Sequence, residues 1–413
     1  MRIRLAIIVS HPIQHFAPWH RELAKIQDLD PKVFFCRNWG SSSYLDPGFN
    51  VQVQWDIPLL DGYKHEFLTA KGRQRQKRFF GIDNAGVTTA LTQFLPDVVQ
   101  VFGYSSRTTW RAASWARRNR RPLLIYSDSN AKTIPTWWKR PIKELVVRQF
   151  YDYVDAALFV GDNNRDYHLR YGVPPDRLFQ GVLPIQRDRL MQAVPDIDKN
   201  RRELRYKLGI PADSFVVLFC GKFTPRKRPL DLVRAVHALA RKGLPVWALL
   251  VGEGEDRSLI EDFCAKNGVN NIVLTGFVNQ SVIPRYYACA DILAVTSVID
   301  PHPLVVTESS AFGLPIIASD GVGCIGPQDT AQPDRNALVY PAGDVRRLTD
   351  CIELLWRERD LYTRMAAESS RIAQSQDVSV AAQQLALAVR TLHKLGPRYS
   401  PSIKFDTVDR ILV

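Results

Sequence analysis

Residues 215–319 alternate short apolar runs with amphipathic segments, and this alternation constrains the fold more than any other feature of the chain. The candidate strands are 215–219, 246–251, 271–277, 292–296 and 315–319, and the candidate helices between them are 230–241, 256–267, 282–289 and 305–312. Apolar runs that alternate with amphipathic helices are typical of parallel sheets covered on both faces. This half of the chain is therefore predicted to be a doubly wound α/β domain.

The first half repeats the pattern less regularly, with candidate strands at 3–9, 32–36, 98–102, 123–126 and 156–160. A chain of 413 residues exceeds the size of one ordinary hydrophobic core. We therefore predict two Rossmann-like domains and a tail. The proposed boundaries are 1–190 for the N-terminal domain, 184–205 for a charged connector, 206–376 for the C-terminal domain and 377–413 for a final segment with a helical stretch at 378–395.

Two carboxylates eight residues apart, Asp300 and Glu308, follow the apolar run 292–298. A Gly-Leu-Pro turn at 313–315 and a second apolar run come after them. This order predicts that both acids lie near the carboxyl ends of parallel strands, the edge at which open α/β sheets bind ligands. We favour a binding site over the alternative of a solvated helix end.

The acidic stretch resembles the Glu-x7-Glu signature of family 4 retaining glycosyltransferases, with Asp300 in place of the first Glu. The segment Gly221-Lys-Phe-Thr-Pro-Arg-Lys227 is similar to the family's Gly-Arg-Leu-x-x-x-Lys segment. The resemblance implies the GT-B architecture, in which two Rossmann-like domains face each other across a cleft and the C-terminal helix usually crosses back onto the first domain. It also implies a nucleotide-sugar donor on the second domain and an acceptor on the first.

The same resemblance assigns roles to residues of the second half. Glu308 is expected to hold the ribose of the nucleotide, and Asp300 to face the transferred sugar. Lys222 and Lys227 are expected to stabilise the diphosphate as the glycosidic bond breaks, and Arg226 lies in the same loop. Lys222, Lys227, Asp300 and Glu308 are thus the catalytic candidates. The candidate donor-binding residues are Arg226, Gly252, Gly254, Phe277, Val278, His302, Pro303 and Leu304.

Polar residues follow several candidate strands of the first half. Family members often have a Gly-Gly loop after the first strand, whereas this chain has Ser10-His-Pro-Ile-Gln-His-Phe16. His11, Gln14 and His15 in this loop are candidates for sugar or acceptor contacts, and a helix cap with satisfied histidines is the alternative. Tyr104 and Asp128 follow two further strands and are candidates of the same kind. Asp128 falls in a region where relatives often have a His that touches the donor sugar.

The net charge of +13 is concentrated in the first half of the chain, and residues 101–150 contain 11 Lys and Arg against 2 Asp and Glu. Basic clusters occur at 71–78 and 117–121, and a third, 135–143, contains Trp137 and Trp138 beside two cations. Aromatic rings beside cations suit a surface that rests on anionic lipid headgroups. A solvated basic face is the alternative, and no nucleic-acid-binding motif accompanies the charge.

These features together predict a metal-independent, retaining glycosyltransferase of the hexosyltransferase type. The predicted reaction moves a sugar from a nucleotide-sugar, a substrate rather than a cofactor, to a hydroxyl of a glycan. The expected acceptor is lipid-linked or a precursor of a cell-surface polysaccharide. Two alternatives remain open: a nucleotide-sugar epimerase of the same fold, and a non-catalytic subunit that binds a nucleotide-sugar.

The expected location is the cytoplasm, with peripheral contact at the inner face of the membrane if the basic surface binds lipid. The six cysteines form no metal-binding pattern and several lie in apolar stretches, which is typical of reduced core thiols. The N-terminal apolar run has no signal-peptide cleavage site, and no apolar run reaches the length that a membrane span needs.

Overall fold

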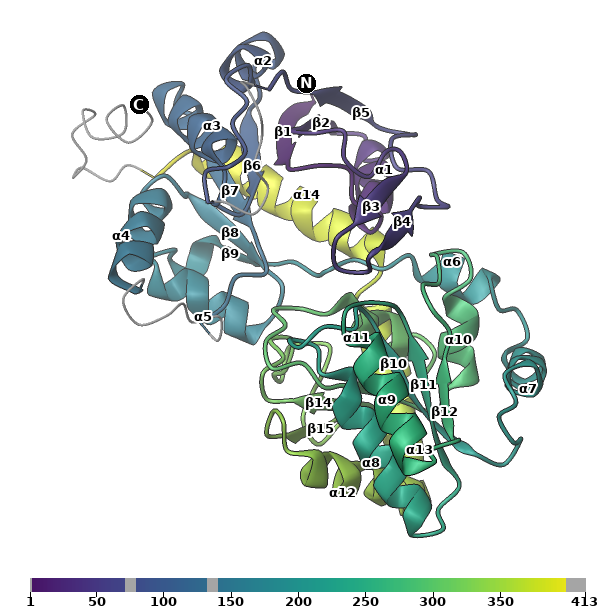
Figure 1. Cartoon of the computed structure of the whole chain (residues 1–413). Coiled ribbons are helices and arrows are strands. Elements are labelled where there is room, and N and C mark those ends of the chain that lie inside the picture. The colour runs from purple at the N-terminus through teal and green to yellow at the C-terminus, as the bar shows by residue number, and fades with distance from the viewer. Residues whose placement is uncertain (1, 71–78, 132–139, 399–413) are drawn as a thin grey trace.

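The computed structural model describes residues 2–70, 79–131 and 140–398 of the chain. The basic cluster at 71–78 and the residues Trp137, Trp138 and Lys139 of the third cluster lie outside the described residues. The described part folds into two α/β domains, each built on a parallel sheet (Figure 1).

The N-terminal domain has a seven-stranded sheet with the strand order β5-β2-β1-β6-β7-β8-β9. Its strands are β1 (Ile3–Val9), β2 (Leu29–Phe35), β5 (Lys64–Phe67), β6 (Val98–Phe102), β7 (Leu123–Tyr126), β8 (Ala156–Phe159) and β9 (Leu178–Gln180). Its helices are α1 (Phe16–Ala24), α2 (Val87–Phe94), α3 (Arg107–Arg118), α4 (Arg140–Tyr151) and α5 (Asp162–Arg170). A separate antiparallel hairpin, β3 (Tyr44–Asp46) and β4 (Val51–Val53), follows β2.

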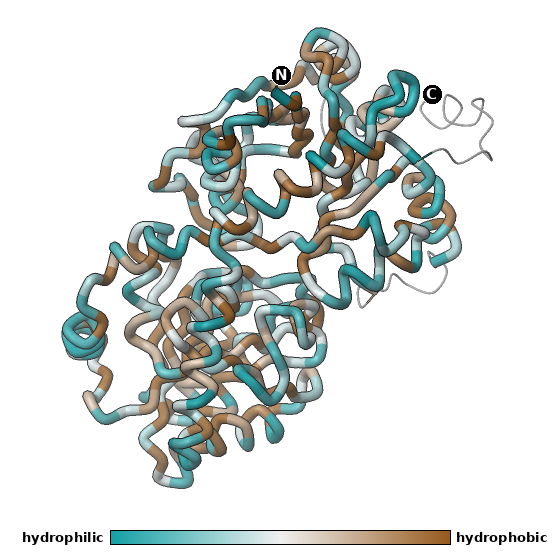
Figure 2. Tube along the Cα trace, turned by 180° about the vertical axis from the view of Figure 1, so that it is seen from behind, coloured by the Kyte–Doolittle hydropathy of each residue, from teal (hydrophilic) through white to brown (hydrophobic). Residues whose placement is uncertain are grey.

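The C-terminal domain has a six-stranded sheet with the strand order β12-β11-β10-β13-β14-β15. Its strands are β10 (Phe215–Cys220), β11 (Val246–Val251), β12 (Ile272–Leu274), β13 (Ile292–Val295), β14 (Ile316–Ser319) and β15 (Ala337–Tyr340). Its helices are α8 (Pro229–Arg241), α9 (Arg257–Asn267), α10 (Pro284–Cys289), α11 (Leu304–Ser310), α12 (Val345–Arg357) and α13 (Arg359–Gln374). The hydrophobic stretches run through the interior of both domains (Figure 2).

Each sheet reverses its winding at one point, between β1 and β6 in the first domain and between β10 and β13 in the second. Ligands of open α/β sheets bind at the carboxyl ends of the strands that flank such a point. Lys222 follows β10, Asp300 follows β13, His15 follows β1 and Tyr104 follows β6. The topology therefore places candidate residues at the favoured edge of both sheets.

The last helix, α14 (Val378–Leu395), belongs to the hydrophobic core of the N-terminal domain. It runs along that domain's sheet (yellow in Figure 1), and its residues Leu385, Val389 and Leu392 are buried in one cluster with Trp19 and Leu23 of α1. The chain thus crosses between the domains twice, once before β10 and once before α14.

The segment 184–205 is more structured than the predicted connector. It contains α6 (Arg187–Gln192) and most of α7 (Ile197–Lys207). Leu204 of α7 is buried in the C-terminal core, and the guanidinium of Arg205 donates to the Asp291 carboxylate at 2.8 Å. Residues of α7 thus pack and pair with the C-terminal domain, about one helix before the predicted boundary at residue 206.

Candidate active site

The loop after β10 carries Lys227, which forms an ion pair with Asp300 of the loop after β13. Both side chains are largely buried. The hydroxyl of Thr296 donates to the carbonyl oxygens of Lys227 (2.6 Å) and Arg228 (3.0 Å), which fixes the backbone of the cationic loop against β13. Two residues 73 positions apart in the chain thus form one charged pair at the switch point of the C-terminal sheet.

Glu308 lies in α11, and its carboxylate accepts a hydrogen bond from the hydroxyl of Tyr287 at 2.5 Å. Burial raises the pKa of Glu308, while the Tyr287 hydrogen bond acts in the opposite direction. Tyr287 belongs to α10 and is almost completely buried. Tyr287 therefore orients the carboxylate, a role that sequence reasoning missed because the helix before the acidic strand reads as packing.

Lys222 contacts the N-terminal domain. Its ammonium lies 2.7 Å from the carboxylate of Asp46 and 4.7 Å from the centroid of the Phe49 ring. Both partners come from the hairpin formed by β3 and β4. Lys222 was predicted to contact the diphosphate, and neither Asp46 nor Phe49 was predicted as its partner. Nothing in a short polar segment marks it as a neighbour of a residue 176 positions away.

Phe277 also packs against the N-terminal domain, with its ring centroid 5.1 Å from that of Phe49 and 6.3 Å from that of Trp55. Its neighbour Val278 is half-buried against the C-terminal core. The side chain of Arg226 is exposed, and its carbonyl oxygen accepts from the backbone N–H of Val298 at 2.9 Å. Of these three donor-binding candidates, Phe277 alone lies between the domains.

Gly252 and Gly254 are required by the packing of backbone against backbone. Gly252 has φ +147°, and a Cβ atom there would lie 1.9 Å from the carbonyl oxygen of Gly221. Gly254 has φ +152°, and its Cβ would lie 2.3 Å from the carbonyl oxygen of Phe223. Both glycines therefore hold the loop that follows β11 directly against the cationic loop.

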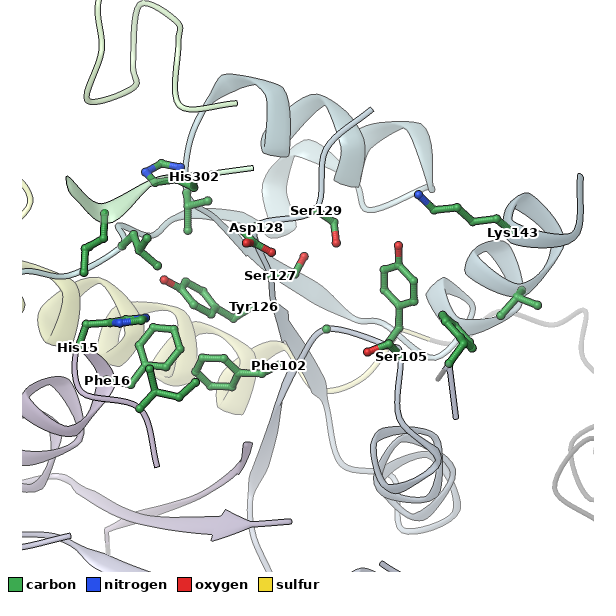
Figure 3. Close-up of a pocket in the computed structure, with 18 of the residues that line it drawn as sticks. His15, Phe16, Phe102, Ser105, Tyr126, Ser127, Asp128, Ser129, Lys143 and His302 are labelled. Atoms are coloured by element: carbon green, nitrogen blue, oxygen red, sulfur yellow. The ribbon is translucent and has the colours of Figure 1, made fainter. Parts of the chain in front are cut away.

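A cavity of about 980 Å³ opens at the carboxyl ends of the strands β6 and β7 (Figure 3). Its wall is largely apolar and aromatic, with Phe16, Phe79, Phe80, Phe102 and Tyr126 among its residues. Sequence analysis did not single out these aromatics. The cavity also gathers predicted site residues from both domains, namely His15, Tyr104, Asp128, His302 and Leu304.

Burial shifts the pKa values of three polar side chains that line the cavity. Burial lowers the pKa of His302 to about 4 and that of His15 to about 4, so both imidazoles are neutral at pH 7. Neither His302 Nε2 nor His15 Nδ1 has a hydrogen-bond partner among the described residues. Burial, together with the nearby carboxylate of Asp300, raises the pKa of Asp128. These groups can hydrogen-bond the hydroxyls of a sugar.

The other candidates lie differently. His11 and Gln14 are outside the cavity wall, and the Nδ1 atom of His11 lies 2.8 Å from the Ser10 hydroxyl. The hydroxyl of Tyr104 is hydrogen-bonded to that of Tyr167 at 2.7 Å, so Tyr104 presents mainly its ring. Pro303 caps the start of α11 between His302 and Leu304.

Solved structures share this architecture. The Anabaena protein HepE in complex with UDP superposes with a TM-score of 0.71 at 17% identity, covering 95% of this chain and 100% of that one. Sucrose-phosphate synthase of Thermosynechococcus elongatus gives a TM-score of 0.71 at 18% identity, with the same coverage. The predicted GT-B fold, with two Rossmann-like domains, is confirmed.

Residues 200–371, most of the C-terminal domain, match the model of the family described as glycosyl transferases group 1. The lipopolysaccharide core biosynthesis glycosyltransferase LpsE of Rhizobium meliloti is 31% identical over 162 residues, 39% of this chain and 45% of the relative. The chain spans about half the length of the curated relatives it matches. The resemblance to group 1 glycosyltransferases is thereby confirmed, while the assignment to family 4 stays a prediction.

The packing at Gly252 generates a stability prediction. Gly252→Ala should destabilise the C-terminal domain by about 3 kcal/mol or more, because backbone strain and overpacking each cost about 1–3 kcal/mol. Gly268→Ala is the matched control, since Gly268 also has a positive φ (+62°) but no atom within 4 Å of the added Cβ. Urea unfolding measures the free energy of unfolding of each variant. Equal losses of stability in the two variants would contradict the packing argument.

Proposed function

We propose that the protein is a retaining, metal-independent glycosyltransferase that uses a nucleotide-sugar donor. The observation that carries the proposal is the Lys227–Asp300 pair at the switch point of a group 1 glycosyltransferase domain, beside a cavity that both domains line. HepE has been solved with UDP and with UDP-glucose, which supports a nucleotide-sugar ligand.

In the proposed reaction, the bond between the anomeric carbon and the β-phosphate oxygen breaks, and the acceptor oxygen bonds to the anomeric carbon on the same face. Negative charge accumulates on the leaving diphosphate, so the ammonium groups of Lys222 and Lys227 stabilise the transition state more than the ground state. The leaving phosphate oxygen takes the proton of the acceptor hydroxyl, which removes the need for a separate base.

Asp300 and Glu308 have distinct tasks in this scheme. Asp300 orients Lys227 and hydrogen-bonds hydroxyls of the transferred sugar. Glu308, held by Tyr287, accepts hydrogen bonds from the ribose hydroxyls. His302 and Asp128 contact the sugar or the acceptor from opposite domains, since both line the cavity.

The cavity favours transfer over the two alternatives. An epimerase of the same fold needs no acceptor site, and a subunit that only binds a nucleotide-sugar does not need Lys227 and Asp300 beside such a cavity. Incubation with UDP- and GDP-sugars, with and without candidate acceptors, separates the three functions. Acceptor-dependent release of nucleotide supports transfer, an epimerised nucleotide-sugar formed without acceptor supports the epimerase, and binding without turnover supports the subunit.

We further propose that the acceptor is a lipid-linked glycan. The cavity is mostly apolar, and α4 at its edge exposes Ile142 (62%) and Leu145 (59%) beside the exposed cations Arg140 and Arg148. A mycobacterial relative, 27% identical over 56% of this chain and 60% of its own length, is named a GDP-mannose-dependent phosphatidylinositol monomannoside mannosyltransferase. In the described part of the chain, no helix is long and apolar enough to cross a bilayer.

Replacing Glu308 tests the ribose contact. Glu308→Gln keeps the size of the side chain but removes the charge, and hydrogen bonds to charged groups contribute roughly 1.5–3 kcal/mol. Calorimetry should show at least a tenfold loss of UDP or GDP affinity. Tyr287→Phe, which keeps the carboxylate but removes its partner, should lose less; unchanged affinity in Glu308→Gln would rule out the ribose role.

The membrane proposal predicts binding to vesicles that contain anionic lipid at low ionic strength, weakening as salt rises because the attraction is screened. Replacing both Ile142 and Leu145 by Ser should reduce sedimentation with vesicles. The matched control replaces Leu259 (54% exposed) and Leu354 (41% exposed) of the C-terminal domain by Ser. No vesicle binding at low salt, or an equal loss in both pairs, would contradict the proposal.

A further inference from the structure

The hairpin formed by β3 and β4 contacts the head group of Lys222. Oδ1 of Asp46 accepts hydrogen bonds from Lys222 Nζ (2.7 Å) and from the backbone N–H groups of Gly48 (2.8 Å) and Phe49 (3.0 Å). A Cβ atom at Gly48 would lie 2.5 Å from Lys222 Cδ, so the hairpin backbone touches the lysine stem. With the Phe49 ring 4.7 Å away, the ammonium lies between a carboxylate and an aromatic face.

The residues just after the hairpin, Gln54 and Asp56, form a second set of contacts with the C-terminal domain. The Asn279 side chain donates to the carbonyl oxygen of Gln54 at 2.6 Å. The carboxylate of Asp56 accepts from the backbone N–H of Ser281 at 3.2 Å and from its hydroxyl. Residues 44–56 therefore form a strap from the N-terminal domain across the loops that follow β10 and β12.

We propose that this strap is autoinhibitory: Asp46 occupies, on Lys222, the place of the donor diphosphate, and a diphosphate binds only when Asp46 leaves. This inference rests on the proposed function, which makes Lys222 a diphosphate ligand. A carboxylate and a diphosphate held on one ammonium would repel each other at short range in a partly buried site, where charges interact more strongly than in water.

Protonation does not release the strap near neutral pH. Burial favours a higher pKa for Asp46, but the Lys222 ammonium and the N–H groups of Phe49 and Gly48 hold the pKa below its ordinary value. The Asp46 carboxylate is thus charged, and an anion must displace it. Because the strap belongs to the N-terminal domain, its release would link donor binding to the contact between the domains.

Because a diphosphate must displace Asp46, its apparent affinity is the intrinsic affinity multiplied by the fraction of molecules in which Lys222 is free of Asp46. Asp46→Asn keeps an oxygen for the Gly48 and Phe49 N–H groups but removes the negative charge that faces the Lys222 ammonium. Isothermal titration with UDP, GDP and inorganic pyrophosphate should show about tenfold tighter binding than in the wild-type protein, corresponding to a tenfold larger available fraction. Binding of uridine and guanosine, which lack phosphate, should not change.

Asp61→Asn is the matched control, because it removes one negative charge from an exposed residue just beyond the strap that takes part in neither set of strap contacts. A double-mutant cycle adds the second test: in a Lys222→Met background, Asp46→Asn should give no gain. An equal gain in Asp61→Asn, a gain that persists without Lys222, or no gain in Asp46→Asn would each overturn the inference. If UDP and GDP bind the wild-type protein and Asp46→Asn equally, only the inference fails; if neither binds any variant, the proposed function fails with it.

Discussion

Two ammonium groups at the carboxyl edge of β10 each face a carboxylate from another part of the chain, and the rest of the site is arranged around these pairs. Lys227 is held by Asp300 of the loop after β13, and Lys222 by Asp46 of the other domain. Placing such cations in a partly buried position is unfavourable unless a counter-charge compensates. The anions of the protein therefore preserve a site whose proposed ligand is itself an anion.

The two domains contribute to one space. His302 and Leu304 come from the C-terminal domain, yet they line the cavity at the edge of the N-terminal sheet with Asp128 (Figure 3). The loop that carries Asp300 continues directly into His302, so Asp300 and the cavity wall belong to one short segment of the chain. The proposed donor on one domain and the proposed acceptor on the other would therefore lie next to each other.

The sequence predicted the parts of the fold that carry strong periodic signals. The strands β10, β11, β13 and β14 and the helix α14 lie where apolar runs and amphipathic patterns indicated. The short edge strands β5 and β9 were missed, because each has only three or four residues and neither has a fully buried residue to give a pattern.

Most contacts between segments far apart in the chain could not be predicted from the sequence either. The motif placed Lys227 and Asp300 at one edge, since both follow neighbouring strands of a parallel sheet. No local pattern links Asp46 to Lys222 or Tyr287 to Glu308, because these contacts depend on how loops fold back in three dimensions. The aromatic cavity wall likewise comes from four separate segments, each of which reads as ordinary core on its own.

The central claim is that Lys227 stabilises a leaving diphosphate, and the turnover of Lys227→Ala tests it most directly. Once a donor and an acceptor have been identified, turnover should fall on the order of 100- to 1000-fold, the usual cost of losing a preorganised charge. Affinity for the sugar-free nucleoside should stay near that of the wild-type protein. Arg241→Ala, at the opposite end of the following helix α8 and with an exposed side chain, should have little effect. Turnover of Lys227→Ala within a few-fold of the wild-type value would contradict the account.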